Sequence, residues 1–305
     1  MKSLRLLLCA LPLALTGCST LSSINWSAAY PWNWFGSSTE VTEQGVGKIT
    51  ASTALDQDAI QEAIGSDYRL RSGMKTDALK NASFELKCGE ILGIVGTSGS
   101  GKSTLLRLIS GLEAPDAGSI RLDGHELGTK RSIAEKRDIQ MIFQDAGASF
   151  HPRRTIASSI NDAFQSLMGK GAVLDLDTLC LNVGLSSQLA QRYPGSLSGG
   201  QCQRFAIARA IASSPKVLLC DEITSALDVS SQAQILALLS SLRKDKGMSI
   251  IFVSHDISVV STLCDRMLVM RGGDIVEQGN TKSIISAPRN EYTKGLIASV
   301  MEVKH

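Results

Sequence analysis

The chain has 305 residues, enough for one large domain or two small ones with a stable core. Thirty-one basic and 29 acidic residues leave a net charge of +2, so charge gives no reason to expect nucleic acid or a strongly acidic partner. The seven cysteines are scattered singly, without a Cys-x-x-Cys pair or metal-ligand spacing. This pattern favours reduced, buried thiols over a disulfide framework.

The first 18 residues have the features of an export signal. Lys2 and Arg5 precede an apolar stretch over residues 6–15, and small residues follow. A basic start, a short apolar centre and a small-residue exit are typical of secretory signals. Residues 15–18 also resemble a bacterial lipobox, whose cysteine, here Cys18, is lipidated after cleavage. An apolar helix lying on a membrane, or a disordered start, is the alternative interpretation.

Residues 19–76 differ in composition from the rest of the chain. They contain all three tryptophans, and residues 19–54 are rich in Ser, Thr, Asn and Gly, which is typical of a tether or linker. Apolar side chains at helical spacing predict one short helix over residues 55–64. This whole N-terminal part resembles the start of a small enterobacterial envelope lipoprotein. We therefore predict three parts: a signal segment over 1–18, a lipoprotein-like tether over 19–76 and a domain over 77–305.

Strands and helices alternate from about residue 77. Short apolar runs predict strands, over residues 91–95, 217–220 and 250–253. Helical spacing predicts one helix that ends at residue 109 and another within residues 197–212. It also predicts helices over residues 230–243 and 257–263. Such alternation is typical of an α/β fold with a mostly parallel sheet, whose sites lie at the carboxyl edge. Residues 145–196 contain no strong strand pattern and should form an inserted helical subdomain.

A Gly-rich loop connects the first of these strands to its helix. It matches the pattern G-x-x-x-x-G-K-[ST] of a phosphate-binding loop (P-loop). Its residues are Gly96, Thr97, Ser98, Gly99, Ser100, Gly101, Lys102, Ser103 and Thr104. Glycines let backbone amides converge on a phosphate, and the helix N-terminus adds its partial positive charge. We expect Lys102 to neutralise the β- and γ-phosphates and Ser103 to ligate Mg²⁺.

Two acidic residues follow the apolar run over 217–220. Asp221 ends the predicted strand, where its carboxylate can reach the Mg²⁺ shell. We expect Glu222 to point elsewhere, because strand side chains alternate, and to act as the general base that polarises the attacking water. A lone Asp-Glu pair is usually a solvated turn. Here the preceding apolar residues and the upstream P-loop favour the functional interpretation.

Polar side chains also follow two other apolar runs. Gln144 comes after residues 141–143, and His255 comes after residues 251–254. An amide at the first position can complete the metal shell and sense the γ-phosphate. An imidazole at the second can hydrogen-bond the γ-phosphate and the water. An ordinary polar residue at a strand end is the alternative for each. The other histidines lie in turn, loop and tail contexts, namely His125, His151 and His305.

A second Gly-rich loop lies between these motifs. Its residues are Leu197, Ser198, Gly199, Gly200 and Gln201, at the start of a predicted helix. A second anion site in one chain makes sense if each nucleotide lies between two subunits. With the motifs in this order, residues 77–305 resemble the ABC ATPases, which have a P-loop NTPase fold and hydrolyse ATP with Mg²⁺. The resemblance implies that Ser198, Gly199 and Gly200, with Gln201 in the same nucleotide site, contact the γ-phosphate held by the opposite subunit. It also implies a D-loop over residues 225–228.

Two further stretches resemble the ATPases of oligopeptide, dipeptide and nickel importers. They are residues 143–145 followed by 149–155, and a tail in which Pro288 precedes Tyr292 and Thr293. The resemblance implies an ATPase subunit that pairs with an identical or paralogous second ATPase and docks on membrane permease subunits through the helical subdomain. It would serve an external solute-binding protein indirectly, lie at the cytoplasmic face of the inner membrane, and drive import of peptides or nickel.

The chain departs from the ABC pattern at several positions. Cys202 stands where a basic or polar residue usually follows the second loop, and Ile223 where proline usually follows the glutamate. Residues 78–86 correspond to the strand before the P-loop strand, and little of family type precedes them. Tyr68 lies 34 residues before Lys102 and is a candidate to stack on adenine, although it lies in the lipoprotein-like part.

The N-terminal part leaves other interpretations open. An exported lipoprotein with its lipid on Cys18 would carry a non-functional ABC domain, because the envelope holds no ATP. A fusion, natural or from sequence assembly, with a junction near Thr76 and Asp77 would explain both parts. A soluble ABC ATPase of repair or translation is disfavoured, because those proteins usually carry two cassettes or zinc-binding cysteines.

Overall fold

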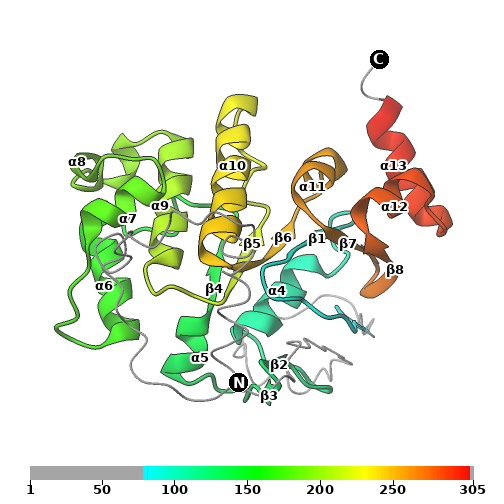
Figure 1. Cartoon of the computed structure of the whole chain (residues 1–305), viewed down its shortest axis with the longest axis horizontal. Coiled ribbons are helices and arrows are strands. Elements are labelled where there is room, and N and C mark those ends of the chain that lie inside the picture. Colours follow the sequence, from blue (N-terminus) through cyan, green and yellow to red (C-terminus); the bar gives the residue numbers. More distant parts are fainter. Residues whose placement is uncertain (1–77, 81, 303–305) are drawn as a thin grey trace, which may run out of the picture. The chain divides into compact units, whose positions relative to one another are not determined.

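The computed structural model describes residues 78–80 and 82–302, which fold as an α/β structure (Figure 1). Several predicted features lie outside these residues and have no structural counterpart here. They are the export signal with Cys18, the tether, the helix over residues 55–64, Tyr68, and the junction near Thr76 and Asp77.

The central sheet has six strands in the order β4-β5-β6-β1-β7-β8. The strands are β1 (Ile91–Val95), β4 (Ile139–Ile142), β5 (Val217–Asp221), β6 (Ser249–Val253), β7 (Arg266–Arg271) and β8 (Asp274–Asn280). The neighbours from β4 to β7 pair in parallel, and β8 joins β7 in antiparallel fashion at one edge. The prediction of a mostly parallel sheet is confirmed.

The central strands are buried on both faces. Every residue of β1, β5 and β6 is buried, as expected for continuous apolar runs in a covered parallel sheet. Alternate residues of β1 face opposite sides: Ile91 and Val95 pack in one apolar cluster, and Leu92 and Ile94 in another. The core therefore consists of two layers separated by the sheet.

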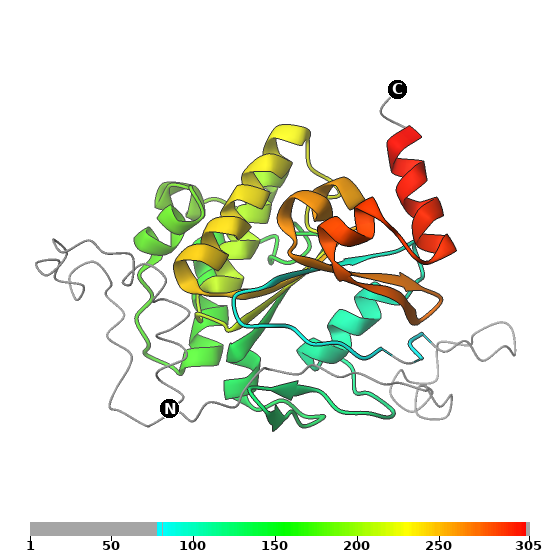
Figure 2. The same cartoon turned by 45° about the vertical axis from the view of Figure 1, so that its right-hand side comes forward.

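Helices cover both layers. On one face lie α9 (Gly199–Ile211), α10 (Val229–Lys246) and α11 (Ile257–Leu263). On the other lie α4 (Lys102–Ser110) and the hairpin of β2 (Arg121–Leu122) and β3 (His125–Glu126). Figure 2 shows α4 below the sheet, with α10 and α11 above it. The remaining helices of the sheet domain are α5 (Ile133–Asp138), α12 (Thr281–Ser286) and α13 (Glu291–Glu302).

The predicted helical subdomain is inserted between β4 and β5. It contains α6 (Ile156–Met168), α7 (Leu176–Asn182), α8 (Ser187–Ala190) and the short 3₁₀ helix η2 (Pro194–Ser196). The Thr155 hydroxyl caps α6 by accepting the Ser158 N–H. Figure 1 places these helices at the end of the molecule away from α13.

The register of the sheet brings three strand ends level. Ile94 of β1 pairs with Val253 of β6, and Val253 pairs with Asp221 of β5. The P-loop follows β1, Glu222 lies directly after β5, and His255 lies in the loop after β6. Because parallel strands place their carboxyl ends at one edge, these loops meet there.

The strand expected over residues 78–86 does not form. Among the described residues of this segment, only Ser83 makes a strand-type bridge. Apolar residues still alternate into the core as in a strand, and Leu79, Phe84 and Leu86 pack against the α4 side of the sheet. The segment therefore packs in the core without a hydrogen-bonded ladder, so the strand expected from the family resemblance is absent from its described residues.

Candidate nucleotide site

The P-loop is shaped by close contacts that only glycine permits. A side chain at Gly96 would place its Cβ 2.3 Å from the Met270 carbonyl oxygen, and one at Gly101 would lie 2.6 Å from the Ala78 carbonyl oxygen. Gly101 also has a φ of 100° and forms the N-cap of α4. The loop is therefore pressed between β7 and the segment that precedes β1.

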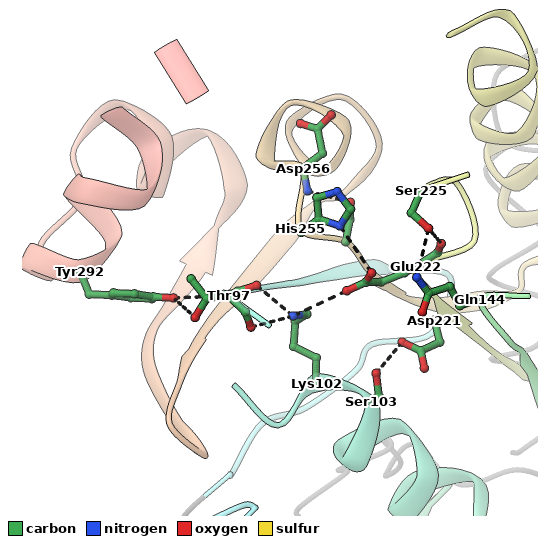
Figure 3. Close-up of polar contacts among 12 residues, drawn as sticks. Thr97, Lys102, Ser103, Gln144, Asp221, Glu222, Ser225, His255, Asp256 and Tyr292 are labelled. Carbon is green, nitrogen blue, oxygen red and sulfur yellow. Dashed lines mark hydrogen bonds and ion pairs between the residues drawn. The ribbon is translucent and has the colours of Figure 1, made fainter. Parts of the chain in front are cut away.

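Lys102 lies under the loop and is 5% exposed. Its ammonium donates hydrogen bonds to the carbonyl oxygens of Gly96, at 2.9 Å, and Thr97, at 3.1 Å. The same nitrogen is 3.7 Å from a carboxylate oxygen of Glu222 (Figure 3). The lysine is therefore held by loop carbonyls on one side and by an acidic group on the other.

Ser103 and Asp221 form a second polar pair beside the lysine. The Ser103 hydroxyl donates a 3.0 Å hydrogen bond to Asp221 Oδ1. Burial is the main cause of a raised pKa at Asp221. The hydrogen bond from Ser103 lowers this pKa, and the nearby Glu222 carboxylate raises it. A divalent cation would stabilise the charged carboxylate, and a carboxylate with a hydroxyl is an oxygen donor set that Mg²⁺ accepts. These two residues therefore fit a magnesium ion.

Glu222 follows β5 in a left-handed turn with a φ of 48°. Its N–H still donates to Val253 of β6, at 3.1 Å, but its side chain leaves the strand. One carboxylate oxygen faces Lys102, and the other lies 3.4 Å from His255 Nδ1. Glu222 does point away from Asp221, but the reason given from the sequence was wrong: a backbone turn, and not strand alternation, separates the two carboxylates.

His255 is the outermost member of this group. Its side chain is 60% exposed, whereas that of Glu222 is 20% exposed. The histidine follows Ser254, whose hydroxyl accepts the Asp256 N–H at 3.0 Å. The imidazole therefore contacts the carboxylate on its inner side and is open to solvent on the other.

Gln144 joins the site through Ser225 and not through the Ser103–Asp221 pair. Its amide nitrogen lies 3.4 Å from the Ser225 hydroxyl, which donates at 2.9 Å to the Glu222 carbonyl oxygen. No hydrogen bond in residues 82–302 connects the Gln144 side chain to Ser103 or Asp221. Gln144 thus reaches the turn that carries Glu222.

The second Gly-rich loop lies apart from the P-loop of its own chain. Ser198 and Gln201 form a capping box at the start of α9: the Ser198 hydroxyl accepts the Gln201 N–H at 3.2 Å, and the Gln201 side chain accepts the Ser198 N–H at 3.1 Å. A Cβ at Gly200 would be 3.0 Å from Ser231 of α10. Within the described residues, no hydrogen bond or ion pair joins this loop to the P-loop.

One contact of the P-loop was missed from the sequence. The Tyr292 hydroxyl accepts the Thr97 N–H at 3.1 Å and lies 3.2 Å from the Thr97 hydroxyl. In the sequence Tyr292 stands out only as part of the tail motif with Pro288 and Thr293. That motif was the available signal, but it gave no indication of which surface the tyrosine would reach.

Other described residues singled out from the sequence lie outside this group, and His305 lies outside the part of the chain that the structure describes. His125 is in β3, and the His151 ring accepts the Arg153 N–H in a loop. Four of the five described cysteines are buried, and Cys88 is exposed. Ile223 is buried at 1% exposure, so the isoleucine in place of the usual proline packs into the core.

Comparisons with known proteins identify relatives of this chain. A family model described as "ABC transporter" matches residues 79–225, and one described as "Protein of unknown function (DUF1131)" matches residues 23–89. The oligopeptide transport ATP-binding protein OppF of Haemophilus influenzae is 44% identical over 230 residues, which cover 73% of this chain and 69% of that protein.

Two further matches extend the comparison. The glutathione import ATP-binding protein GsiA of Shigella dysenteriae is 43% identical over 245 residues, or 76% of this chain, but the match spans only 39% of GsiA. A solved ATP-binding cassette, described as a dimer in a post-hydrolysis state with ADP and Pi, has a TM-score of 0.62, 28% identity and coverage of 78% of this chain and 97% of that chain. The chain therefore belongs to the ABC transporter family and contains the ATP-binding, ATP-hydrolysing domain of that family.

Proposed function

We propose that the chain is the ATP-hydrolysing subunit of an ABC importer for peptides. The observation that carries the proposal is the convergence of Lys102, the Ser103–Asp221 pair and the Glu222–His255 pair at one edge of the sheet. The substrate class rests on the relatives, which are named for oligopeptide transport and glutathione import. Glutathione is itself a tripeptide, so both names favour peptides over nickel.

The P-loop would hold the phosphates of ATP. Backbone amides of residues 96–104 and the N-terminus of α4 favour an anion, and Lys102 would leave the carbonyls of Gly96 and Thr97 to contact the β- and γ-phosphates. Ser103 and Asp221 would hold Mg²⁺, and Gln144 would complete its shell by exchanging its contact with Ser225 for the ion. The bound ion would neutralise charge that develops on the phosphates during hydrolysis.

Glu222 would act as the general base. Its carboxylate lies between Lys102, which would contact the γ-phosphate, and His255. A water between the γ-phosphate and Glu222 could lose its proton to the carboxylate as it attacks. His255 would hydrogen-bond the γ-phosphate and the water from the solvent side.

Hydrolysis would need a second ATPase subunit. Ser198, Gly199, Gly200 and Gln201 lie away from their own P-loop and would complete the site of an opposite subunit, identical or paralogous. The D-loop over residues 225–228 would link the two sites, because Ser225 bonds to Gln144 and Asp228 caps α10. The related cassette described as a dimer favours this arrangement.

The remaining partners would be membrane proteins. The helical subdomain would dock on permease subunits, and an external solute-binding protein would be served indirectly. None of the helices in residues 82–302 has the length and apolar character needed to cross a bilayer. We propose the cytoplasmic face of the inner membrane as the site of action, because that is where ATP and the permease are both available.

We further propose that residues 1–76 have a different origin from the ATPase domain over 77–305. The match of residues 23–89 to a separate family favours a different origin for the N-terminal part, although it runs past residue 76 and overlaps the ABC match, which begins at residue 79. Labelled palmitate should be incorporated by the wild-type chain and not by Cys18→Ser if the lipoprotein alternative holds. Sequencing reads across the codons for residues 70–80 would decide between a natural fusion and an assembly error.

Uptake in cells tests the importer proposal. Deletion of the gene should abolish ATP-dependent uptake of labelled di- to oligopeptides, and the wild-type gene should restore it. A Lys102→Ala gene should not. Lost nickel uptake with normal peptide uptake would assign the chain to nickel import, and normal uptake of both would overturn the importer proposal.

A further inference from the structure

Tyr292 connects the last helix of the chain to the P-loop. It lies in the first turn of α13, 195 residues from Thr97 in sequence. Its hydroxyl accepts the Thr97 N–H at 3.1 Å and lies 3.2 Å from the Thr97 hydroxyl, to which it donates (Figure 3). The Tyr292 hydroxyl therefore forms hydrogen bonds with both the backbone N–H and the side-chain hydroxyl of Thr97.

The tyrosine ring is fixed from several sides. The Arg271 guanidinium lies over the ring, 5.0 Å from its centre. The Asn290 side chain accepts the Tyr292 N–H at 2.9 Å, and Glu277 of β8 accepts the Asn290 N–H at 3.1 Å. The next residue, Thr293, is fully buried. The hydroxyl is thus presented by a helix start that is anchored to the sheet.

Thr97 also contacts Lys102 of the P-loop. Its carbonyl oxygen accepts a 3.1 Å hydrogen bond from the Lys102 ammonium, which lies 3.7 Å from Glu222. The loop is braced again at Ser100, whose carbonyl accepts the Gly273 N–H at 3.1 Å. Contacts from α13 and from the β7–β8 turn therefore hold the P-loop at two points.

We propose that Tyr292 is a positioning residue for nucleotide binding. It holds Thr97 so that the P-loop amides and Lys102 are already arranged for the phosphates, which makes α13 part of the nucleotide site. The inference rests on the proposed role of the P-loop in ATP binding. Glu222 and His255 follow other strands, β5 and β6, and Tyr292 contacts neither of them, so Tyr292 should affect ATP affinity and leave the chemical step nearly unchanged.

Tyr292→Phe in the full chain tests the inference. It removes the hydroxyl and keeps the ring under Arg271. A neutral hydrogen bond corresponds to about a two- to tenfold change in an equilibrium constant. We expect the Kd for a fluorescent ATP analogue to rise by about that factor and kcat at saturating ATP to stay close to wild type, while the nucleotide-free Tm falls by no more than a few degrees. Ser299→Ala is the control, because it removes an exposed hydroxyl from the same helix.

A double-mutant cycle with Thr97→Val shows whether the two side chains act together. If they do, the rise in Kd for the double variant is smaller than the product of the two single changes. An unchanged Kd, a product of independent effects, or a fall in kcat or Tm without a change in Kd would each overturn the inference. Failure of the wild-type chain to bind ATP would overturn the proposed function as well, so the two failures are distinguishable.

Discussion

Replacing Glu222 with glutamine should separate ATP binding from ATP hydrolysis. The substitution keeps the shape of the side chain and removes its negative charge and its ability to accept a proton. The Glu222 carboxylate lies 3.7 Å from the Lys102 ammonium and 3.4 Å from His255 Nδ1. Both contacts lie where the γ-phosphate and the attacking water would meet.

The expected loss of hydrolysis is large and the expected loss of binding is small. General-base catalysis contributes about 10²- to 10⁴-fold, so kcat should fall by that factor. The ion pair with Lys102 corresponds to a Coulomb attraction on the order of 1–4 kcal/mol at this separation, before desolvation and ordering are subtracted. Losing it frees the lysine for the phosphates and removes a negative charge beside them. ATP affinity should therefore stay the same or increase.

Phosphate release and equilibrium binding of an ATP analogue would measure the two effects. Glu113→Gln is a matched control, because Glu113 is 45% exposed and its only ion pair within residues 82–302 is with Arg107 at the surface. Its kcat and Kd should equal those of the wild type. Turnover of Glu222→Gln within tenfold of wild type would exclude Glu222 as the base. Lost ATP binding would show instead that the carboxylate is needed to arrange the P-loop.

Three other predictions address stability and reactivity. Asp221→Asn should raise the nucleotide-free Tm by a few degrees, because burial disfavours the charged carboxylate, while Mg²⁺-dependent ATP binding is lost; an unchanged or lower Tm in calorimetry would contradict this. Gly101→Ala should lower Tm and abolish ATP binding, because its Cβ would lie 2.6 Å from a backbone oxygen at a φ of 100°; normal binding would refute the steric argument. Iodoacetamide should modify Cys88 in the native protein and spare the buried thiols, among them Cys180, whose pKa burial raises to about 11; mass spectrometry locates the label, and fast labelling of Cys180 would show that the core opens.

Much of the nucleotide site could be predicted because it depends on strand ends. Apolar runs at residues 91–95, 217–220 and 250–253 correspond to β1, β5 and β6, with differences of one residue at the ends of two of them. In a parallel sheet the carboxyl ends of neighbouring strands lie level, so local patterns were enough to bring Lys102, Asp221 and His255 together. The positions of apolar runs, together with this one rule of sheet topology, therefore predict which residues far apart in the sequence lie close together.

The features that the sequence did not predict depend on backbone turns and distant contacts. The left-handed φ of Glu222 is unusual for a residue with a side chain, and no local pattern predicts it. The segment over residues 78–86 corresponds to a strand in the family pattern, but here it packs in the core with only one bridge among its described residues, which the resemblance did not predict. The Tyr292–Thr97 contact joins residues 195 apart, and no rule of sheet topology determines where α13 begins its first turn.

The cap of α9 gives a physical reason to expect a second subunit. The Ser198 hydroxyl accepts the Gln201 N–H, which leaves its own hydrogen available to an outside acceptor. The first amides of a helix have no partner within it, and no acceptor in the described part of this chain is bonded to the N–H groups of Gly199 and Gly200. A hydroxyl and two amides at the positive end of a 13-residue helix together favour an anion. Because the chain's own P-loop lies elsewhere, we expect that anion to be a phosphate presented by another subunit.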